Sequence, residues 1–399
     1  MTVTDPDWTQ RPAALRVGMI GYGFMGKAHA QAWRNAGRFF ELPLRPELAV
    51  LCGRSAEALE PAAETYGFAS WETDWRRLIA REDIDVIDIC TPGDTHAEIA
   101  VAALEAGKHV LCEKPLANTV AEAAAMTRAA HGAAEAGVFA MLGFTYRRVP
   151  AIQLARELVL GGQIGAVRQV RAAYLQDWLT DEAAPMSWRL DQTMAGTGAL
   201  GDLGSHIIDA VQFVTGQLLT AVTGVTRTFI AERPWPGGTA GPPLGHVTVD
   251  DATAFLGTLS GGVLATFEAT RMAAGRKNAL RLEISGSAGA VAFDLEDLNS
   301  LQYYRADDGP TAGFRRILVT EPEHPYVAAW WPPGHALGYE HAFSHQVADL
   351  VVALSKGEQP QPSFEDGYQV QRVMEAVERS SASGCWESVE SGSGAGSGG

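Results

Sequence analysis

The stretch GMIGYGFMGKAHAQAW (Gly18–Trp33) follows apolar residues typical of a strand and runs into an alanine-rich segment typical of a helix. It places three glycines in the spacing G-x-G-x-x-G: Gly21, Gly23 and Gly26. In such a unit the first glycine permits a tight turn, the second lets the backbone approach a pyrophosphate, and the third lets the helix pack on the sheet. The helix N-terminus, with Phe24 and Met25, favours negative charge. A tight turn without a ligand is the less favoured alternative.

The same alternation of strand and helix patterns continues along the chain. We predict strands at residues 15–21, 48–53, 85–90, 109–113 and 138–142. Alanine-rich helical patterns lie between them, as at residues 96–107 and 120–137. This order is typical of a parallel sheet with crossover helices. We therefore expect an N-terminal extension over residues 1–14 and a doubly wound, Rossmann-type α/β domain over residues 15–145.

The pattern changes after this domain. A short helix is predicted at residues 151–162, and polar and apolar residues alternate at 167–178, 253–272 and 278–295. Such alternation indicates antiparallel strands of a second sheet that is open on one face to solvent or to a partner subunit. Proline and glycine make residues 232–250 a predicted irregular loop. A second domain over residues 146–390 should end with a helix at about 364–383 that packs back near the first domain, before a disordered tail at 391–399.

Composition excludes several classes of function. The 399 residues suffice for two cores, and 46% of them are apolar. A net charge of −16 argues against a general nucleic-acid or anionic-membrane binder and leaves a small molecule as the expected partner. The sequence shows neither a secretory signal nor a segment of membrane-spanning length. Its four cysteines include no close pair, so we expect reduced thiols in a cytoplasmic protein.

The end of the second predicted strand bears on the choice of dinucleotide. An acidic residue there would accept hydrogen bonds from the adenosine ribose, but the chain has Gly53, Arg54 and Ser55. An arginine followed by a hydroxyl suits a 2′-phosphate, which favours NADP(H). NAD(H) is the alternative, because backbone groups can also hold a ribose.

Two further motifs contain polar residues suited to catalysis. In HVLCEKPLA (His109–Ala117), Glu113 and Lys114 follow a strand, at the sheet edge where open α/β sheets bind ligands. In GALGDLGSHIIDA (residues 198–210), Asp202, His206 and Asp209 recur at helical spacing. Taken singly, the lysine could be a surface residue and the helix a packed domain interface.

Together, GYGFMGKAH, EKP and GALGDLGSHIIDA resemble the Gfo/Idh/MocA family of nicotinamide-dependent sugar and polyol oxidoreductases. The resemblance extends from about Arg16 to Trp386. It implies a Rossmann domain followed by an α/β domain with a large, open, mostly antiparallel sheet. The outer face of that sheet commonly serves oligomer formation in the family, so we expect a homo-oligomer, either a dimer or a tetramer.

The family's conserved lysine, aspartate and histidine fall on Lys114, Asp202 and His206. Oxidising a secondary alcohol needs a base for the hydroxyl proton, and histidine titrates in a useful range. We expect Lys114 to stabilise the developing alkoxide and Asp202 to hold the imidazole or the sugar hydroxyls. Asp209 is assigned a mainly structural role.

Other residues are expected to line the site. For the cofactor these are Thr91, Pro92, His96, Glu113 and Lys114, besides the glycine-rich turn and residues 53–55. For the substrate they are Tyr146, Arg147, Gln176, Trp178, Trp188, Arg189 and Tyr339, because sugars bind through hydrogen bonds and ring stacking. Gly93 and Thr145 depart from the family's usual asparagines. His341 and His345 lie one turn apart without a third ligand, so we assign them to a helix surface and expect no metal site.

The expected activity is hydride transfer between a nicotinamide and a ring secondary alcohol of a sugar, anhydrosugar, glycoside or inositol, giving a keto-sugar. A non-catalytic dinucleotide sensor of the same fold is one alternative, although a sensor has no need of the proton-handling residues. A sugar–sugar oxidoreductase with tightly bound cofactor is another.

Overall fold

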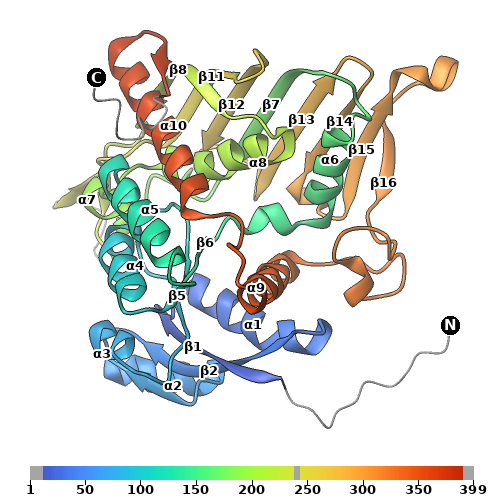
Figure 1. Ribbon diagram of the computed structural model, residues 1–399. Coiled ribbons are helices and arrows are strands. Elements are labelled where there is room, and N and C mark those ends of the chain that lie inside the picture. The colour runs from blue at the N-terminus through green and yellow to red at the C-terminus, as the bar shows by residue number, and fades with distance from the viewer. Residues whose placement is uncertain (1–11, 238–242, 390–399) are drawn as a thin grey trace, which may run out of the picture.

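The computed structural model describes residues 12–237 and 243–389 and contains two large sheets (Figure 1). The first has six parallel strands in the order β3-β2-β1-β4-β5-β6. Its strands are β1 (Ala13–Ile20), β2 (Leu44–Cys52), β3 (Ser70–Glu72), β4 (Val86–Ile89), β5 (His109–Cys112) and β6 (Ala140–Leu142). Its helices are α1 (Phe24–Phe39), α2 (Ala56–Tyr66), α3 (Trp75–Ile79), α4 (His96–Glu105) and α5 (Val120–Ala134). The predicted Rossmann sheet is confirmed, and β3, too short to show a pattern, was missed.

The second sheet has nine strands in the order β16-β15-β14-β13-β7-β12-β11-β8-β17, and only β7 and β12 pair in parallel. Its strands are β7 (Val167–Leu175), β8 (Leu219–Arg227), β11 (Ala252–Leu259), β12 (Leu264–Thr270), β13 (Ala279–Gly286), β14 (Gly289–Asp294), β15 (Ser300–Arg305), β16 (Arg315–Leu318) and β17 (Glu387–Ser388). The helices α6 (Pro150–Leu160), α8 (Ser205–Thr215) and α10 (Phe364–Ser383) cover one face (Figure 1). The predicted open, mostly antiparallel sheet is therefore confirmed.

The segment expected to be an irregular loop contains a short ribbon instead. The strand β9 (Glu232–Pro234) pairs antiparallel with β10 (Leu244–His246). Arg233, which is fully buried, donates from Nη2 to the Leu179 carbonyl (2.8 Å) and from Nη1 to the Asp181 carbonyl (2.7 Å). These tertiary bonds stabilise extended backbone that local composition does not favour. The expected extension and tail lie largely outside the described residues.

The helix α9 (Tyr339–Lys356) packs on the Rossmann domain rather than on the second sheet. Its apolar side chains share a buried cluster with Val17 and Trp33. His345 is fully buried there, with Nδ1 lying 2.9 Å from the Arg148 carbonyl and Nε2 accepting from Trp330 (2.7 Å). Burial lowers its pKa to about 3. The assignment of His345 to a helix surface was wrong, because its partners come from distant segments.

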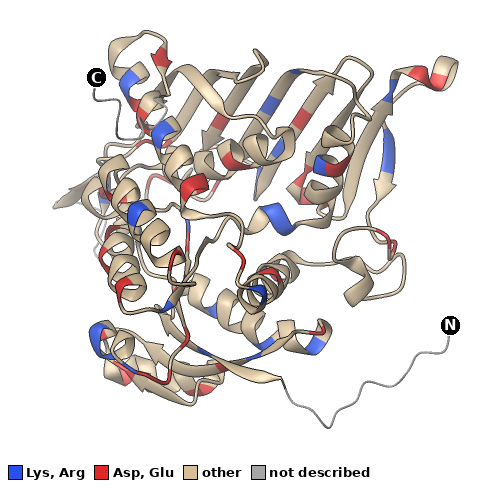
Figure 2. Cartoon of the chain, viewed as in Figure 1, with Lys and Arg blue, Asp and Glu red and all other residues tan. Residues whose placement is uncertain are grey.

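Charged side chains of both signs are interspersed over the two domains (Figure 2). Within the described ranges, none of the helices combines the length and the apolar character needed to cross a bilayer.

A buried ion pair connects three elements of the second domain. The Arg147 guanidinium, in η2 (Thr145–Arg148), donates to Asp209 of α8 (Nε to Oδ2, 2.9 Å) and to Asp366 of α10 (3.0 Å). Only 8% of the Arg147 side chain is exposed. The expected substrate contact of Arg147 is therefore corrected to a structural bond, which also agrees with the supporting role assigned to Asp209.

We expect Arg147→Met to lower the free energy of unfolding by about 3–5 kcal/mol, because it leaves Asp209 buried without its cation. Urea denaturation measures this change. Arg128→Met is the control, since Arg128 is exposed on α5, and its effect should stay within about 0.5 kcal/mol. Unchanged stability of Arg147→Met would contradict the structural role of Arg147.

Candidate active site

The glycine-rich turn between β1 and α1 has the geometry that its sequence predicts. Gly21 has a φ of +102°, and a Cβ at Gly26 would lie 2.2 Å from the Gly21 carbonyl oxygen. A Cβ at Gly23 would meet nothing within 4 Å, so space lies open beside it. The first N–H groups of α1, at Phe24 and Met25, have no partner within the helix. The turn thus fits the pyrophosphate of a dinucleotide.

At the end of β2, the side chains of Arg54 and Ser55 are exposed. A Cβ at Gly53 would lie 2.1 Å from the Tyr22 ring, so a side chain there would displace that ring. Two carboxylates, Glu72 and Asp74, also lie near this strand end. Together with burial, which is the larger cause, they raise the pKa of the Cys52 thiol to about 12. Neither carboxylate was predicted to lie there, because β3, which ends at Glu72, is too short to show a strand pattern.

The loops after β4 and β5 are held together by His96. Its ring nitrogens lie 2.9 Å from the Thr91 carbonyl oxygen and 3.0 Å from the Pro115 carbonyl oxygen, and the residue is 1% exposed. The expected cofactor contact of His96 is therefore corrected to a bond between the two loops that flank the site. At Gly93, a Cβ would lie 2.6 Å from Asn118 Oδ1, so the Asn118 amide fills the space of a side chain there.

A buried charged network of His29, Asp88 and Glu113 supports the backbone at Lys114, and it was not predicted from the sequence. His29 Nδ1 lies 2.9 Å from Asp88 Oδ1, and its Nε2 lies 2.9 Å from Glu113 Oε1. Burial opposes protonation, but Asp88 raises the pKa of His29 well above its ordinary value, so the imidazolium donates to both carboxylates. Glu113 Oε2 in turn accepts from the Lys114 backbone N–H (3.2 Å). Glu113 therefore supports Lys114, and its carboxylate is not free for the cofactor.

His29, Asp88 and Cys90 place their ligand atoms within 4.8 Å of one another. Both ring nitrogens of His29 are already taken by carboxylates, which leaves none for a metal ion. A histidine inside an alanine-rich helix face was the signal that could have revealed this network.

Lys114 and Asp202 meet where the two domains adjoin. Lys114 Nζ donates to the Asp202 carbonyl oxygen (2.9 Å) and to its Oδ1 (3.1 Å). Asp202 lies in a π-helical turn, Leu200–Gly204, that leads into α8, rather than in a continuous α-helix. The Asp250 carboxylate fixes the start of this turn by accepting from the backbone N–H groups of Gly198 (2.7 Å) and Leu200 (2.8 Å). The turn thus brings Asp202 to Lys114.

Burial would raise the pKa of Asp202, but Lys114 and Arg271 hold it far below its usual range. Arg271 Nη2 donates to Asp202 Oδ2 at 3.0 Å, a contact that the sequence did not reveal. Asp202 therefore stays ionised at any pH near neutrality.

The His206 ring packs among aromatic residues, with its centroid 4.7 Å from that of Tyr146 and 5.7 Å from that of Tyr174. Among the described residues no hydrogen bond joins it to Asp202, and its buried Nδ1 has no partner. Of the two roles expected for Asp202, the structure does not show a hold on the imidazole, since Lys114 and Arg271 contact the two carboxylate oxygens. A hold on the sugar hydroxyls stays a prediction. Burial and Lys114 lower the pKa of His206 well below 6.5, while Asp202 opposes this. The imidazole is therefore neutral and can accept a proton.

Hydrogen bonds join several of the expected substrate residues into one wall. Tyr146 and Tyr174 share a hydroxyl contact of 2.8 Å, and Tyr174 and Gln176 both donate to Asn278 Oδ1 at 2.7 Å. Trp178 Nε1 donates to Gln176 Oε1 at 2.9 Å. Tyr174 and Asn278 were not predicted, because their roles depend on the pairing of β7 with β13.

The remaining expected substrate residues flank this wall. The Tyr339 ring centroid lies 6.4 Å from those of Tyr146 and Phe24, which places it between the wall and the glycine-rich turn. The Arg189 guanidinium stacks on the Trp188 ring at 4.4 Å. The structure thus places aromatic and hydrogen-bonding groups from both domains around Lys114, Asp202 and His206.

Comparison with known proteins identifies relatives of the whole chain. The model of an oxidoreductase family with an NAD-binding Rossmann fold matches residues 15–144, and that of the GFO/IDH/MocA C-terminal domain matches residues 152–292. Levoglucosan dehydrogenase of Pseudarthrobacter phenanthrenivorans is 40% identical over 387 residues, 94% of this chain and 98% of that protein. Inositol 2-dehydrogenase of Rhizobium meliloti is 27% identical and covers 92% and 97%.

Solved structures agree with these matches. An oxidoreductase domain protein from Kribbella flavida is 62% identical with a TM-score of 0.92, covering 95% of this chain and all of that one (100%). Levoglucosan dehydrogenase in complex with NADH and levoglucosan is 40% identical with a TM-score of 0.90, covering 95% and 100%. The chain therefore belongs to the Gfo/Idh/MocA family of oxidoreductases.

Proposed function

We propose that this protein is a nicotinamide-dependent dehydrogenase that oxidises a ring secondary alcohol of a sugar, anhydrosugar, glycoside or inositol. The observation that carries the proposal is the convergence of ionised Asp202 and neutral His206 on Lys114, which follows the carboxyl end of β5. Relatives that act on levoglucosan and inositol support the substrate class. The hydrogen-bonded wall from Tyr146 to Trp178 suits a polyhydroxylated ring.

Each residue of the trio has a distinct part in the reaction. The nicotinamide, when bound, supplies the hydride acceptor. The neutral His206 imidazole takes the hydroxyl proton, and the Lys114 ammonium donates a hydrogen bond to the same oxygen as negative charge develops on it. Asp202 holds the ammonium in place and offsets its charge. The N–H groups of Phe24 and Met25 would hold the pyrophosphate. The secondary alcohol leaves as a ketone.

His206→Ala and Lys114→Ala should each lower kcat by about 10²–10⁴-fold, the contribution of a general base or of an oxyanion donor. The measurement is NADH absorbance with a panel of levoglucosan, inositols and glycosides. Both variants should still bind NADH, because the glycine-rich turn is unchanged. His335→Ala and Lys356→Ala, both at exposed positions, are the controls.

Wild-type rates in either variant would remove that residue from the mechanism. A folded wild-type enzyme that turns over none of these polyols, with either cofactor, would contradict the proposed function. Nucleotide that stays bound through purification would favour the sugar–sugar oxidoreductase instead.

We propose that Arg54 contacts the 2′-phosphate of NADP(H), because its guanidinium is exposed at the end of β2 and Ser55 adds a hydroxyl. The NADH complexes of levoglucosan dehydrogenase support NAD(H) as a working cofactor too. The carboxylates of Glu72 and Asp74 lie near the same strand end and would repel a bound 2′-phosphate. The positive charge of Arg54 must offset this repulsion when NADP(H) binds.

Arg54→Ala should therefore lower kcat/KM for NADP⁺ by about tenfold or more, the worth of a charge-assisted hydrogen bond, and for NAD⁺ by less than about twofold. Steady-state kinetics with both cofactors measure the ratio. Arg128→Ala is the control, because Arg128 is exposed on α5, and it should leave kcat/KM for both cofactors unchanged. Equal effects on the two cofactors would show that Arg54 does not read the phosphate.

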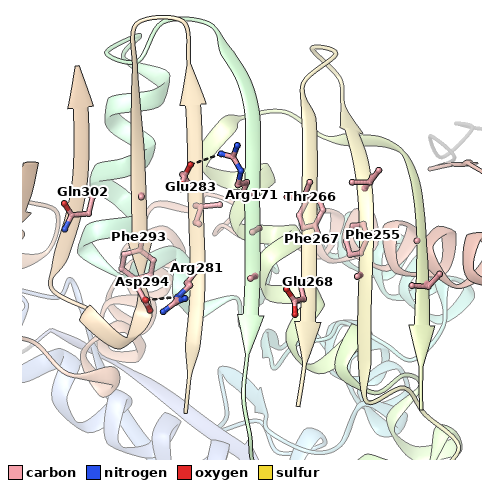
Figure 3. Close-up of a pocket in the computed structure, with 18 of the residues that line it drawn as sticks. Arg171, Phe255, Thr266, Phe267, Glu268, Arg281, Glu283, Phe293, Asp294 and Gln302 are labelled. Atoms are coloured by element: carbon pink, nitrogen blue, oxygen red, sulfur yellow. Dashed lines mark hydrogen bonds and ion pairs between the residues drawn. The ribbon is translucent and has the colours of Figure 1, made fainter. Parts of the chain in front are cut away.

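We propose that a second copy of the chain covers the outer face of the nine-stranded sheet. This face carries a hollow of about 870 Å³ that contains none of the catalytic trio (Figure 3). The ion pairs Arg171–Glu283 (2.7 Å) and Arg281–Asp294 (2.8 Å) lie on β7, β13 and β14, to one side of an apolar strip on β11 and β8 that includes Leu256 and Val225. A face that carries charges of both signs beside an apolar strip can complement itself across a twofold axis.

Leu256→Glu should convert an oligomer into a monomer, because it places a charge on the apolar strip, where Leu256 is 41% exposed. Light scattering after size exclusion measures the mass. Leu160→Glu is the control, since Leu160 is 52% exposed on α6, on the opposite face. A monomeric wild type, or an unchanged oligomer in folded Leu256→Glu, would contradict this interface.

A further inference from the structure

Arg271 follows directly after β12 and is only 1% exposed. Its Nη2 donates to Asp202 Oδ2 at 3.0 Å, and its Nη1 donates to the Arg189 carbonyl at 3.3 Å. The guanidinium carbon also lies 5.3 Å from the centroid of the Trp178 ring. One buried guanidinium therefore contacts the catalytic carboxylate and two parts of the expected sugar site.

Two adjacent residues fix the backbone on both sides of this contact, Asp251 through its backbone carbonyl and Asp250 through its carboxylate. The Arg271 N–H donates to the Asp251 carbonyl (3.0 Å), and the Arg271 carbonyl accepts from the Leu179 N–H (3.2 Å). Asp250 holds the first residues of the π-helical turn that carries Asp202. The guanidinium and the carboxylate thus approach each other from backbones that are both anchored at the start of β11.

The two cations divide the Asp202 carboxylate between them. Lys114 takes Oδ1 at 3.1 Å, and Arg271 takes Oδ2 at 3.0 Å. A carboxylate has two oxygens that can both accept from one ammonium group. Without Arg271, Asp202 would be free to turn and give both oxygens to Lys114. The ammonium would then have fewer donors for the substrate oxygen.

We propose that Arg271 is a positioning residue for the alcohol oxidation. By occupying one oxygen of Asp202, Arg271 keeps one N–H of the Lys114 ammonium available to the substrate. Through its contacts with Trp178 and Arg189, it also fixes the position of these two residues relative to the catalytic trio. This inference rests on the proposed function.

Arg271 also sets the charge around the base. The charged and titratable groups that face Asp202 are Lys114, Arg189, Arg271, His206, Tyr146, Tyr174 and Tyr339. Removing the guanidinium leaves more of the Asp202 charge acting on His206, which raises the pKa of the imidazole. Because protonated His206 cannot act as the base, the acid limb of kcat/KM should move to higher pH.

The test compares Arg271→Gln and Arg271→Lys, with levoglucosan as the sugar. Arg276→Gln is the control, since Arg276 is 44% exposed and pairs with Glu296. Arg271→Gln should lower kcat by about tenfold to a hundredfold, shift the acid limb upward, and leave the Kd for NADH within about twofold. Arg271→Lys should keep the acid limb of the wild type but not its kcat. A fall in activity with an unmoved pH profile in Arg271→Gln would indicate a merely structural role and overturn the proposal.

A crystal structure of Arg271→Gln gives a readout that does not depend on activity. We expect both carboxylate oxygens of Asp202 within 3.5 Å or less of Lys114 Nζ, about the limit of a hydrogen bond. An Asp202 that keeps its wild-type orientation would overturn the positioning role. If the wild type turned over no polyol, the proposed function would fail, while this measurement would still decide what Arg271 does to Asp202.

Discussion

The contact between Lys114 and Asp202 is the interaction on which the site depends, because it joins the Rossmann domain to the second domain at the proposed catalytic site. Such a partly exposed ion pair contributes little to stability by itself. The contact matters because it sets the positions of Lys114 and Asp202, and buried hydrogen bonds fix each of these two residues. The His29 network supports the backbone at Lys114, while Asp250 and Arg271 hold Asp202.

The electrostatic consequence is a separation of protonation states among neighbouring groups. Asp202 is held ionised by two cations, whereas burial and Lys114 keep the imidazole of His206 neutral. An enzyme that transfers a proton near neutral pH needs such a separation. The base must be unprotonated, while a nearby group must stay cationic to stabilise the developing alkoxide. Burial among Tyr146, Tyr174 and Phe144 supplies the low polarity that lowers the pKa of His206.

Features encoded by short-range patterns could be predicted from the sequence. The glycine spacing predicted β1, the turn and α1, and the motif HVLCEKP correctly placed Lys114 just after a strand of the parallel sheet. Features that depend on distant partners could not be. Arg147 meets Asp209 across 62 positions and Asp202 meets Arg271 across 69, and no local pattern reports such pairs. The same holds for His96, Glu113 and His345, whose side chains are used by tertiary bonds, and for the ribbon that Arg233 stabilises.

A crystal structure with NADH and levoglucosan both bound would show which side chains contact the reacting hydroxyl. We expect one ring hydroxyl within hydrogen-bond reach of both Lys114 Nζ and the His206 ring, with the hydrogen of the same carbon directed at the nicotinamide. A sugar whose hydroxyls contact neither Lys114 nor His206, with the nicotinamide in place, would contradict it.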